Sequence, residues 1–204
     1  MALVKYNNNS ISAVTATASI PSGSLVPIKT LTASSSATLS FVHGTDGVVL
    51  DSTYPIYKFE FINIHPASTT DFAFNISTDS GSNYNVAKTT THFSAYHNEG
   101  DTDTNLGYRT TLDLAQGTGF QVLAEITTGN DESTSGTLTL FNPSSTTFVK
   151  HFIARLSDYY SGYSEDRNTA GYANTTSAVN AIQFKMLSGN IDAGKIKLYG
   201  IKDS

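Results

Sequence analysis

The stretch Ser188-Gly189-Asn190-Ile191-Asp192-Ala193-Gly194-Lys195-Ile196-Lys197-Leu198-Tyr199-Gly200-Ile201 carries the clearest fold signal in the sequence. Near its end the side chains alternate, so that Ile196 and Leu198 share one face. The side chains of Lys197 and Tyr199 take the opposite face. An alternation with a period of two predicts a strand that is half buried and half exposed.

The segment just upstream has the same period. Ile182, Phe184 and Met186 share a face, with Gln183 and Lys185 on the other. Turn residues lie between the two segments. We therefore expect the two segments to pair as antiparallel strands that close a sheet.

Working outward, the remaining sequence predicts further strands and no long helix. Residues 25–31 and 38–42 predict a first antiparallel pair, and 56–64 and 72–77 predict two aromatic strands at the core. Weaker alternation surrounds Phe93, residues 98–105 predict an exposed acidic loop, and 157–168 predict a tyrosine-rich polar loop. The other predicted strands are residues 108–114, 120–127, 136–141 and 148–156.

These nine or ten strands predict an all-β protein, an antiparallel β-sandwich or jelly roll with an extended N-terminal arm. We expect the arm at residues 1–22 and a single jelly-roll-like domain at residues 23–204.

The composition excludes several classes of function. Charged residues make up 14% of the chain, the formal net charge is -5, and no block of Lys or Arg occurs, so no nucleic-acid footprint is expected. There is no cysteine for a disulfide or a thiolate metal site. No run approaches the ~18 apolar residues of a membrane span, and we expect synthesis in a cytoplasm without Sec export.

Short patterns of catalytic or metal-binding type are incomplete. Asp101-x-Asp103-x-Asn105 starts like a calcium loop, but Leu106 and Leu112 replace its glycine and bidentate glutamate. Residues 162–166 lack the second glycine of a nucleophile elbow, and residues 117–119 lack the third glycine of a dinucleotide loop.

Other polar residues also lack the pattern of a site. The histidines show no converging spacing, and Lys58 with Glu60 predicts a solvent-facing pair. The glycosylation patterns at Asn8, Asn75 and Asn174 carry no weight without a secretion signal. We expect no enzyme, no catalytic residues, no cofactor and no metal. The histidines are His43, His65, His92, His97 and His151.

The tyrosines leave two alternatives open. Tyr159, Tyr160, Tyr163 and Tyr172 could line a glycan-binding surface, because an aromatic ring stacks on the apolar face of a sugar. A tyrosine-rich loop equally suits a protein interface.

Several segments together resemble a known group of proteins. In order, they are SATLSF (36–41), YKFEFINIHPA (57–67), STDSGSNY (77–84), LFNP (140–143), AIQF (181–184) and the closing stretch, SGNI followed by GKIKLYGI. Over roughly residues 24–201 this order resembles a module of tailed-phage structural proteins, especially predicted virion proteins of marine phages.

The resemblance implies a jelly-roll particle component that trimerises or decorates a surface, without catalytic residues. A capsid decoration or cement protein on the head surface is the favoured expectation, because a tail fibre needs a shaft and an attachment domain. Its partners would be the major capsid protein, neighbouring copies of itself, or both, and it would be synthesised in the host bacterial cytoplasm. The alternative is a tail-fibre or receptor-binding module that recognises host glycans.

Two further expectations concern stability and assembly. Phe59, Phe61, Phe74 and Phe184 are predicted to be core residues. The arm up to about Ile20 is predicted to tether the protein to the particle or to a neighbouring subunit.

Overall fold

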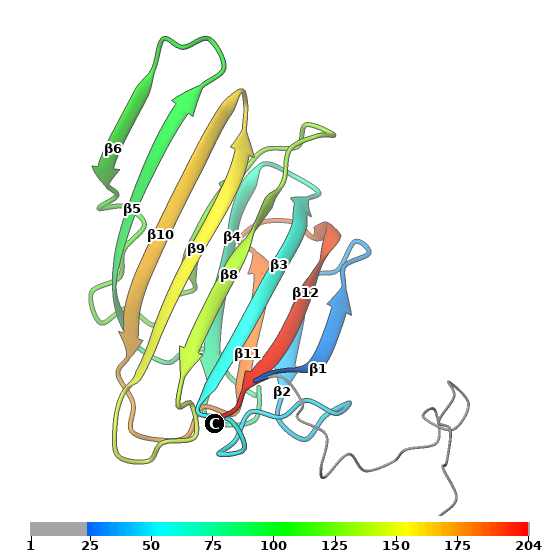
Figure 1. Ribbon diagram of the computed structural model, residues 1–204, viewed down its shortest axis with the longest axis vertical. Coiled ribbons are helices and arrows are strands. Elements are labelled where there is room, and N and C mark those ends of the chain that lie inside the picture. The colour runs from blue at the N-terminus through cyan, green and yellow to red at the C-terminus, as the bar shows by residue number, and fades with distance from the viewer. Residues whose placement is uncertain (1–23, 204) are drawn as a thin grey trace, which may run out of the picture.

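The computed structural model describes residues 24–203, which form twelve antiparallel strands in two sheets and contain no helix (Figure 1). The strands are β1 (Leu25–Thr32), β2 (Leu39–Val42), β3 (Ile56–Pro66), β4 (Thr70–Ser77), β5 (Lys88–Asn98), β6 (Thr104–Tyr108), β7 (Gln121–Ile126), β8 (Thr134–Phe141), β9 (Lys150–Tyr160), β10 (Tyr163–Ala173), β11 (Ala181–Met186) and β12 (Ile191–Ile201). The all-β sandwich expected from the sequence is confirmed.

Eight of these strands make a jelly roll. One four-stranded layer has the order β1-β12-β3-β8, and the facing sheet has the order β2-β11-β4-β7. Along the chain, successive strands of these eight change layer at every step except from β4 to β7, which are neighbours in the small sheet. This connectivity gives the two interlocked Greek keys of a jelly roll.

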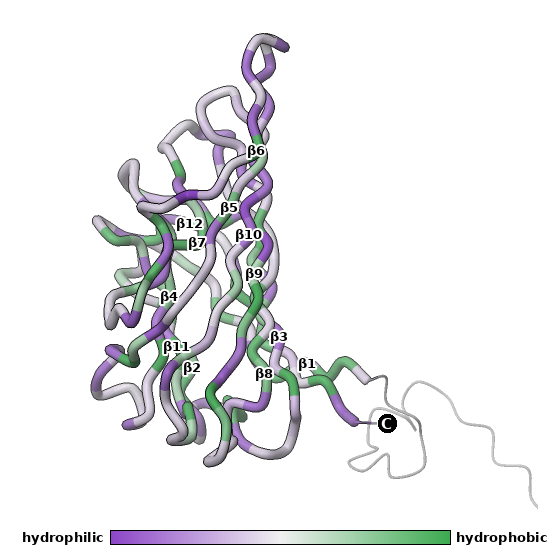
Figure 2. The backbone as a smooth tube through the Cα atoms, turned by 90° about the vertical axis from the view of Figure 1, so that its left-hand side faces the viewer, coloured by the Kyte–Doolittle hydropathy of each residue, from purple (hydrophilic) through white to green (hydrophobic). Residues whose placement is uncertain are grey.

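Two inserted hairpins widen one layer. The hairpin β5–β6 follows β4, the hairpin β9–β10 follows β8, and together they continue the large sheet beyond β8 in the order β9-β10-β5-β6. We call these four strands the extension. It rises past the small sheet at the upper left of Figure 1, and the side view in Figure 2 shows the β5–β6 end projecting from the rest of the molecule.

The core between the two layers is centred on Phe184. Its ring lies 5.2 to 6.3 Å, centroid to centroid, from the rings of five other phenylalanines. All six are at most 2% exposed, and the predicted core residues are therefore buried as expected. The five partners are Phe41, Phe59, Phe61, Phe72 and Phe74.

Both predicted strand pairings are wrong. β1 pairs with β12 in the large sheet, whereas β2 pairs with β11 in the small one. β11 and β12 likewise lie in different layers, β11 against β4 and β12 against β3. Alternation indicates which face of a strand is buried, but two strands with one apolar face each can bury it in the same sheet or in facing sheets.

Two local assignments are also wrong. No strand covers residues 109–114, because β6 ends at Tyr108 and turns follow. The predicted loop at 157–168 is instead the end of β9, a two-residue turn and the start of β10. Polar residues fill both faces of β10, so an apolar alternation was missing from its sequence.

The predicted N-terminal arm and its tethering role lie outside the described residues 24–203, as does the pattern at Asn8. Asn75 is fully buried, and its side-chain amide donates to Tyr84 O at 2.6 Å, so it is no glycosylation acceptor in the fold. In the described part of the chain, no helix is long and apolar enough to cross a membrane.

Candidate interaction surface on the extension

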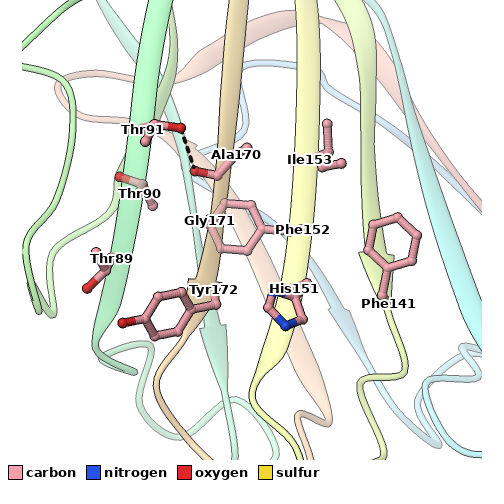
Figure 3. A pocket seen from close by; sticks show the side chains of 10 residues that line it. All are labelled: Thr89, Thr90, Thr91, Phe141, His151, Phe152, Ile153, Ala170, Gly171 and Tyr172. Atoms are coloured by element: carbon pink, nitrogen blue, oxygen red, sulfur yellow. Dashed lines mark hydrogen bonds between the residues drawn. The ribbon is translucent and has the colours of Figure 1, made fainter.

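The outer face of the extension, which points away from the small sheet, has a shallow hollow of about 500 Å³ (Figure 3). Its floor lies at Ala170 and Gly171 on β10, where side chains are minimal. A Cβ atom added to Gly171 would lie 2.6 Å from Thr89 O, so glycine allows β5 and β10 to approach closely here.

Aromatic rings and hydroxyl groups border the hollow. The rings of His151 and Tyr172 lie 6.4 Å apart, and Phe141 lies beyond His151 (Figure 3). On the other side Thr89 and Thr91 contribute hydroxyls. The hollow is therefore mostly apolar, with a few polar groups at one margin.

Exposed apolar side chains continue from the hollow to the end of the sheet. Ile153, beside the hollow, is 55% exposed. Phe93 on β5 is 43% exposed and faces Tyr108 on β6, which is 51% exposed. Leu106, paired with Ala95, is 70% exposed. Cross-strand partners point to the same face, so these residues and the hollow share one surface, which we call the outer apolar surface. The exposed ion pair of Arg155 and Asp166 lies on the same face, between Ile153 and Leu106.

The inner face of the extension, by contrast, is polar and buried. Arg167 is 1% exposed, and its Nε donates to the carboxylate of Asp158, which also accepts from the Thr134 hydroxyl. Arg167 Nη1 donates to Glu125 Oε2 on β7 at 2.7 Å. Burial raises the pKa of Asp158 to about 6, against the lowering effect of Arg167. The cluster links β9 and β10 to the small sheet.

Glu165 completes this charge cluster. Its Oε2 lies 2.8 Å from Arg167 Nη2, at an angle outside hydrogen-bond geometry. One guanidinium thus faces three carboxylates, an arrangement that suits a structural ion network with a buried arginine.

Two buried bases lie farther down the same face. Lys88 Nζ donates to Asn75 Oδ1 at 2.6 Å and to Val86 O at 2.8 Å, and burial lowers its pKa to about 8. His92 Nδ1 lies 2.9 Å from Thr169 Oγ1, and its Nε2 is buried with no hydrogen-bond partner among the described residues. Burial, and then the charge of Arg167, lower the pKa of His92 to about 4.

The tyrosines noted in the sequence divide between different places. Tyr160 and Tyr163 join Tyr96, Asp103 and Glu165 around a small pocket of about 190 Å³ on the inner face. The Tyr96 and Tyr163 rings meet edge to face at 5.6 Å, and Tyr163 Oη donates to Asp103 Oδ2 at 3.3 Å.

The other two tyrosines lie elsewhere. Tyr172 borders the outer hollow, and Tyr159 lies outside both pockets. The four therefore do not make one glycan surface.

The incomplete patterns fall at ordinary structural positions. Asp101 contacts His97 at 3.0 Å, whereas Asp103 bonds Tyr163, so the acidic residues of this loop point to different partners. Gly162 lies in the β9–β10 turn, and Gly117 exchanges main-chain hydrogen bonds with Lys88.

The remaining polar candidates are spread over the fold. Lys58 and Glu60 form a part-exposed ion pair at 3.0 Å. His43 accepts from Leu50 N at 3.1 Å, and His65 lies beside Gly129 O at 3.2 Å. No group of three or more His, Cys, Asp or Glu able to hold a metal ion occurs within residues 24–203.

Comparison with known protein families, curated proteins and solved structures finds no match for this chain.

The outer apolar surface itself was missed by sequence reasoning. Its signal exists as alternation, in Thr89-x-Thr91, His151-x-Ile153 and Ala170-x-Tyr172. Combining the three requires the register that places Tyr172 opposite both His151 and Thr89, and register is a tertiary property.

Proposed function

We propose that this protein is a non-enzymatic bacteriophage virion component, a decoration protein that attaches to the capsid surface through its outer apolar surface. The observation that carries the proposal is the exposure of Phe93, Leu106, Tyr108 and Ile153 together on one side of the extension. Contiguous exposed apolar patches on soluble proteins mark interaction sites.

The location of this surface indicates that its apolar side chains serve an added function and are not needed to pack the jelly-roll core. The jelly-roll core is closed by the small sheet, and none of these four side chains belongs to it. All four lie on strands of the inserted hairpins. Aromatic residues are typical of interface cores, and the exposed Arg155–Asp166 ion pair on the same face adds a charged element to this surface. The virion assignment draws on the resemblance to tailed-phage structural proteins.

The assignment to the capsid is tested by stoichiometry in purified particles. Quantitative mass spectrometry against the major capsid protein should give hundreds of copies per particle for a decoration protein. A few to a few dozen copies would contradict capsid decoration and favour a tail device.

The assignment of the surface is tested with Phe93→Ser combined with Ile153→Ser. Both side chains are substantially exposed, so the melting temperature should stay within about 2 °C of the parent, and particle occupancy should fall at least tenfold. Leu187→Ser is the matched control, because Leu187 is 45% exposed and lies away from the extension. If the control lost as much particle occupancy as the double variant, or if the double variant kept full occupancy, the outer apolar surface would not be the attachment site.

Binding of a host glycan is a second candidate function. The pocket formed by Tyr96, Tyr160 and Tyr163 combines aromatic rings with the carboxylates of Asp103 and Glu165, which can accept hydrogen bonds from sugar hydroxyls. Its size suits a single ring rather than a drug-sized ligand.

A glycan array followed by calorimetry tests this candidate. Tyr163→Ala should abolish any binding found, and Tyr159→Ala should preserve it because Tyr159 lies outside the pocket. Absence of any array signal for the parent protein removes the candidate.

A further inference from the structure

The four sheet edges differ in how well they are protected against pairing with another strand. β1 carries Pro27 and Lys29 with a register irregularity between them, and β2 has four residues. β7 packs against β9 and β10. β6 has no proline, no charged side chain and an unbroken register against β5. Proline, lysine, bulges and shortness are the usual protections of an edge, and β6 has shortness alone, with five residues.

The main chain of β6 is oriented to accept a further strand. Arg109 N donates to His92 O at 2.9 Å, and Asn98 N donates to Asp103 O at 3.0 Å. In an antiparallel pair this bonding recurs at every second residue, so Thr104, Leu106 and Tyr108 direct their N–H and C=O groups away from β5. Within residues 24–203 no strand lies on that side of β6.

A segment of this chain outside the described structure has the sequence of a partner strand. Val14, Ala16, Ala18 and Ile20 alternate with Thr15, Thr17 and Ser19, and no charged residue occurs between Lys5 and Lys29. Small apolar and β-branched residues in period-two order suit an added strand, whose main chain supplies most of the affinity.

This segment is too close in sequence to Ser24 to reach β6 of its own subunit. β1 and β6 are the two outermost strands of the eight-stranded sheet, about 34 Å apart at ordinary strand spacing. Three residues separate Ile20 from Ser24, so the four residue steps between them span about 13 Å of extended chain. A β6 edge that binds residues 14–20 must therefore belong to another copy.

We propose that residues 14–20 of one copy add a strand to the β6 edge of the next copy. When the apolar row of the arm faces the outer side, it lies beside Leu106 and extends the outer apolar surface by one strand. Because the arm leaves one edge of the sheet and binds the opposite edge, the contact is head-to-tail and closes into a ring where the rotation permits. The proposal concerns contacts between copies, so it stands or fails separately from attachment to a capsid.

The first test compares the oligomeric state of three variants of the full chain by native mass spectrometry and light scattering. Deletion of residues 2–20 and Leu106→Pro should each convert the oligomer to monomer. Proline at 106 removes an outward-facing N–H and leaves the β5 ladder intact. Leu106→Ser is the matched control, because it keeps that N–H and should retain most of the oligomer.

The second test uses a synthetic peptide of residues 10–22, labelled for fluorescence anisotropy. It should bind the arm-deleted protein and lose at least tenfold in affinity when Leu106→Pro is added. Thr104→Pro serves in place of Leu106→Pro if the latter lowers the thermal transition of the subunit. The proposal would be overturned if the parent were monomeric or if the oligomer persisted after arm deletion. It would also be overturned if the peptide bound with unchanged affinity to the Leu106→Pro and Thr104→Pro variants. Loss of the oligomer through Leu106→Pro alone would instead indicate β6–β6 pairing between copies.

Discussion

At the scale of single residues, His92 should make the stability of the fold sensitive to acid. Its pKa lies near 4 in the folded chain and at the ordinary 6.5 in the unfolded chain, chiefly because of burial. Between these values the unfolded chain holds a proton that the folded chain does not, so the free energy of unfolding falls as the pH drops from 6.5 to 4. The loss from this group is about 3 kcal/mol at most.

The measurement is chemical denaturation of the parent and of His92→Gln across this pH range. The difference between the two proteins isolates the histidine, since Asp158 titrates in both with an opposite sign, its pKa being raised to about 6. Parallel pH profiles for parent and variant would show that His92 is not the responsible group.

Among the core residues, Phe184 is the one whose truncation should lower the free energy of unfolding most. Its ring contacts five other phenylalanine rings and is fully buried, so Phe184→Ala should lower the free energy of unfolding by about 3 to 5 kcal/mol. Phe148→Ala is the control at a side chain that is 69% exposed and should change stability by less than about 0.5 kcal/mol. Urea titration that gives similar midpoints for both variants would contradict the central position of Phe184.

At the scale of elements, the β9–β10 hairpin depends on its two-residue turn. Ser161 and Gly162 have φ of 48° and 85°, and Tyr160 pairs with Tyr163, which defines a turn with two left-handed residues. Ser161→Asn should raise the free energy of unfolding by about 0.5 kcal/mol, and Ser161→Val should lower it by about 1 to 2 kcal/mol.

The exposed Ser157 on β9 provides the control for this turn. The same change, Ser157→Val, falls in an extended strand that favours a β-branched residue and should not destabilise the protein. If Ser157→Val had a lower melting temperature than Ser161→Val, the destabilisation could not be assigned to the left-handed backbone of the turn.

At the scale of the whole molecule, the jelly roll and the extension should unfold as one unit. β9 continues the ladder of β8 without interruption, and Arg167 on β10 bonds Glu125 on β7 across the two layers. A single calorimetric transition is expected, with a calorimetric enthalpy equal to the van't Hoff enthalpy at subunit concentrations where no oligomer forms. Two resolved transitions would show that the extension is a separate stability unit.

Local patterns in the sequence were enough to predict the strand class, most strand positions and the buried phenylalanines, because side-chain periodicity and β-propensity depend on near neighbours. Ile196, Leu198 and Phe184 are buried as their alternation predicted. The β9–β10 hairpin escaped prediction, because its inner face buries Arg167 and Asp158 as an ion network, and paired charges carry no apolar period.

Strand partners, and with them the candidate site, were decided by the tertiary structure. β11 and β12 follow one another yet lie in opposite layers, because either arrangement would bury their apolar faces and the competition among all twelve strands selects one. The outer apolar surface likewise exists because register brings Phe93, Ile153 and Tyr172 from three strands to one face. Residues that distant in sequence become neighbours through hydrogen-bonded pairing, which no local pattern specifies.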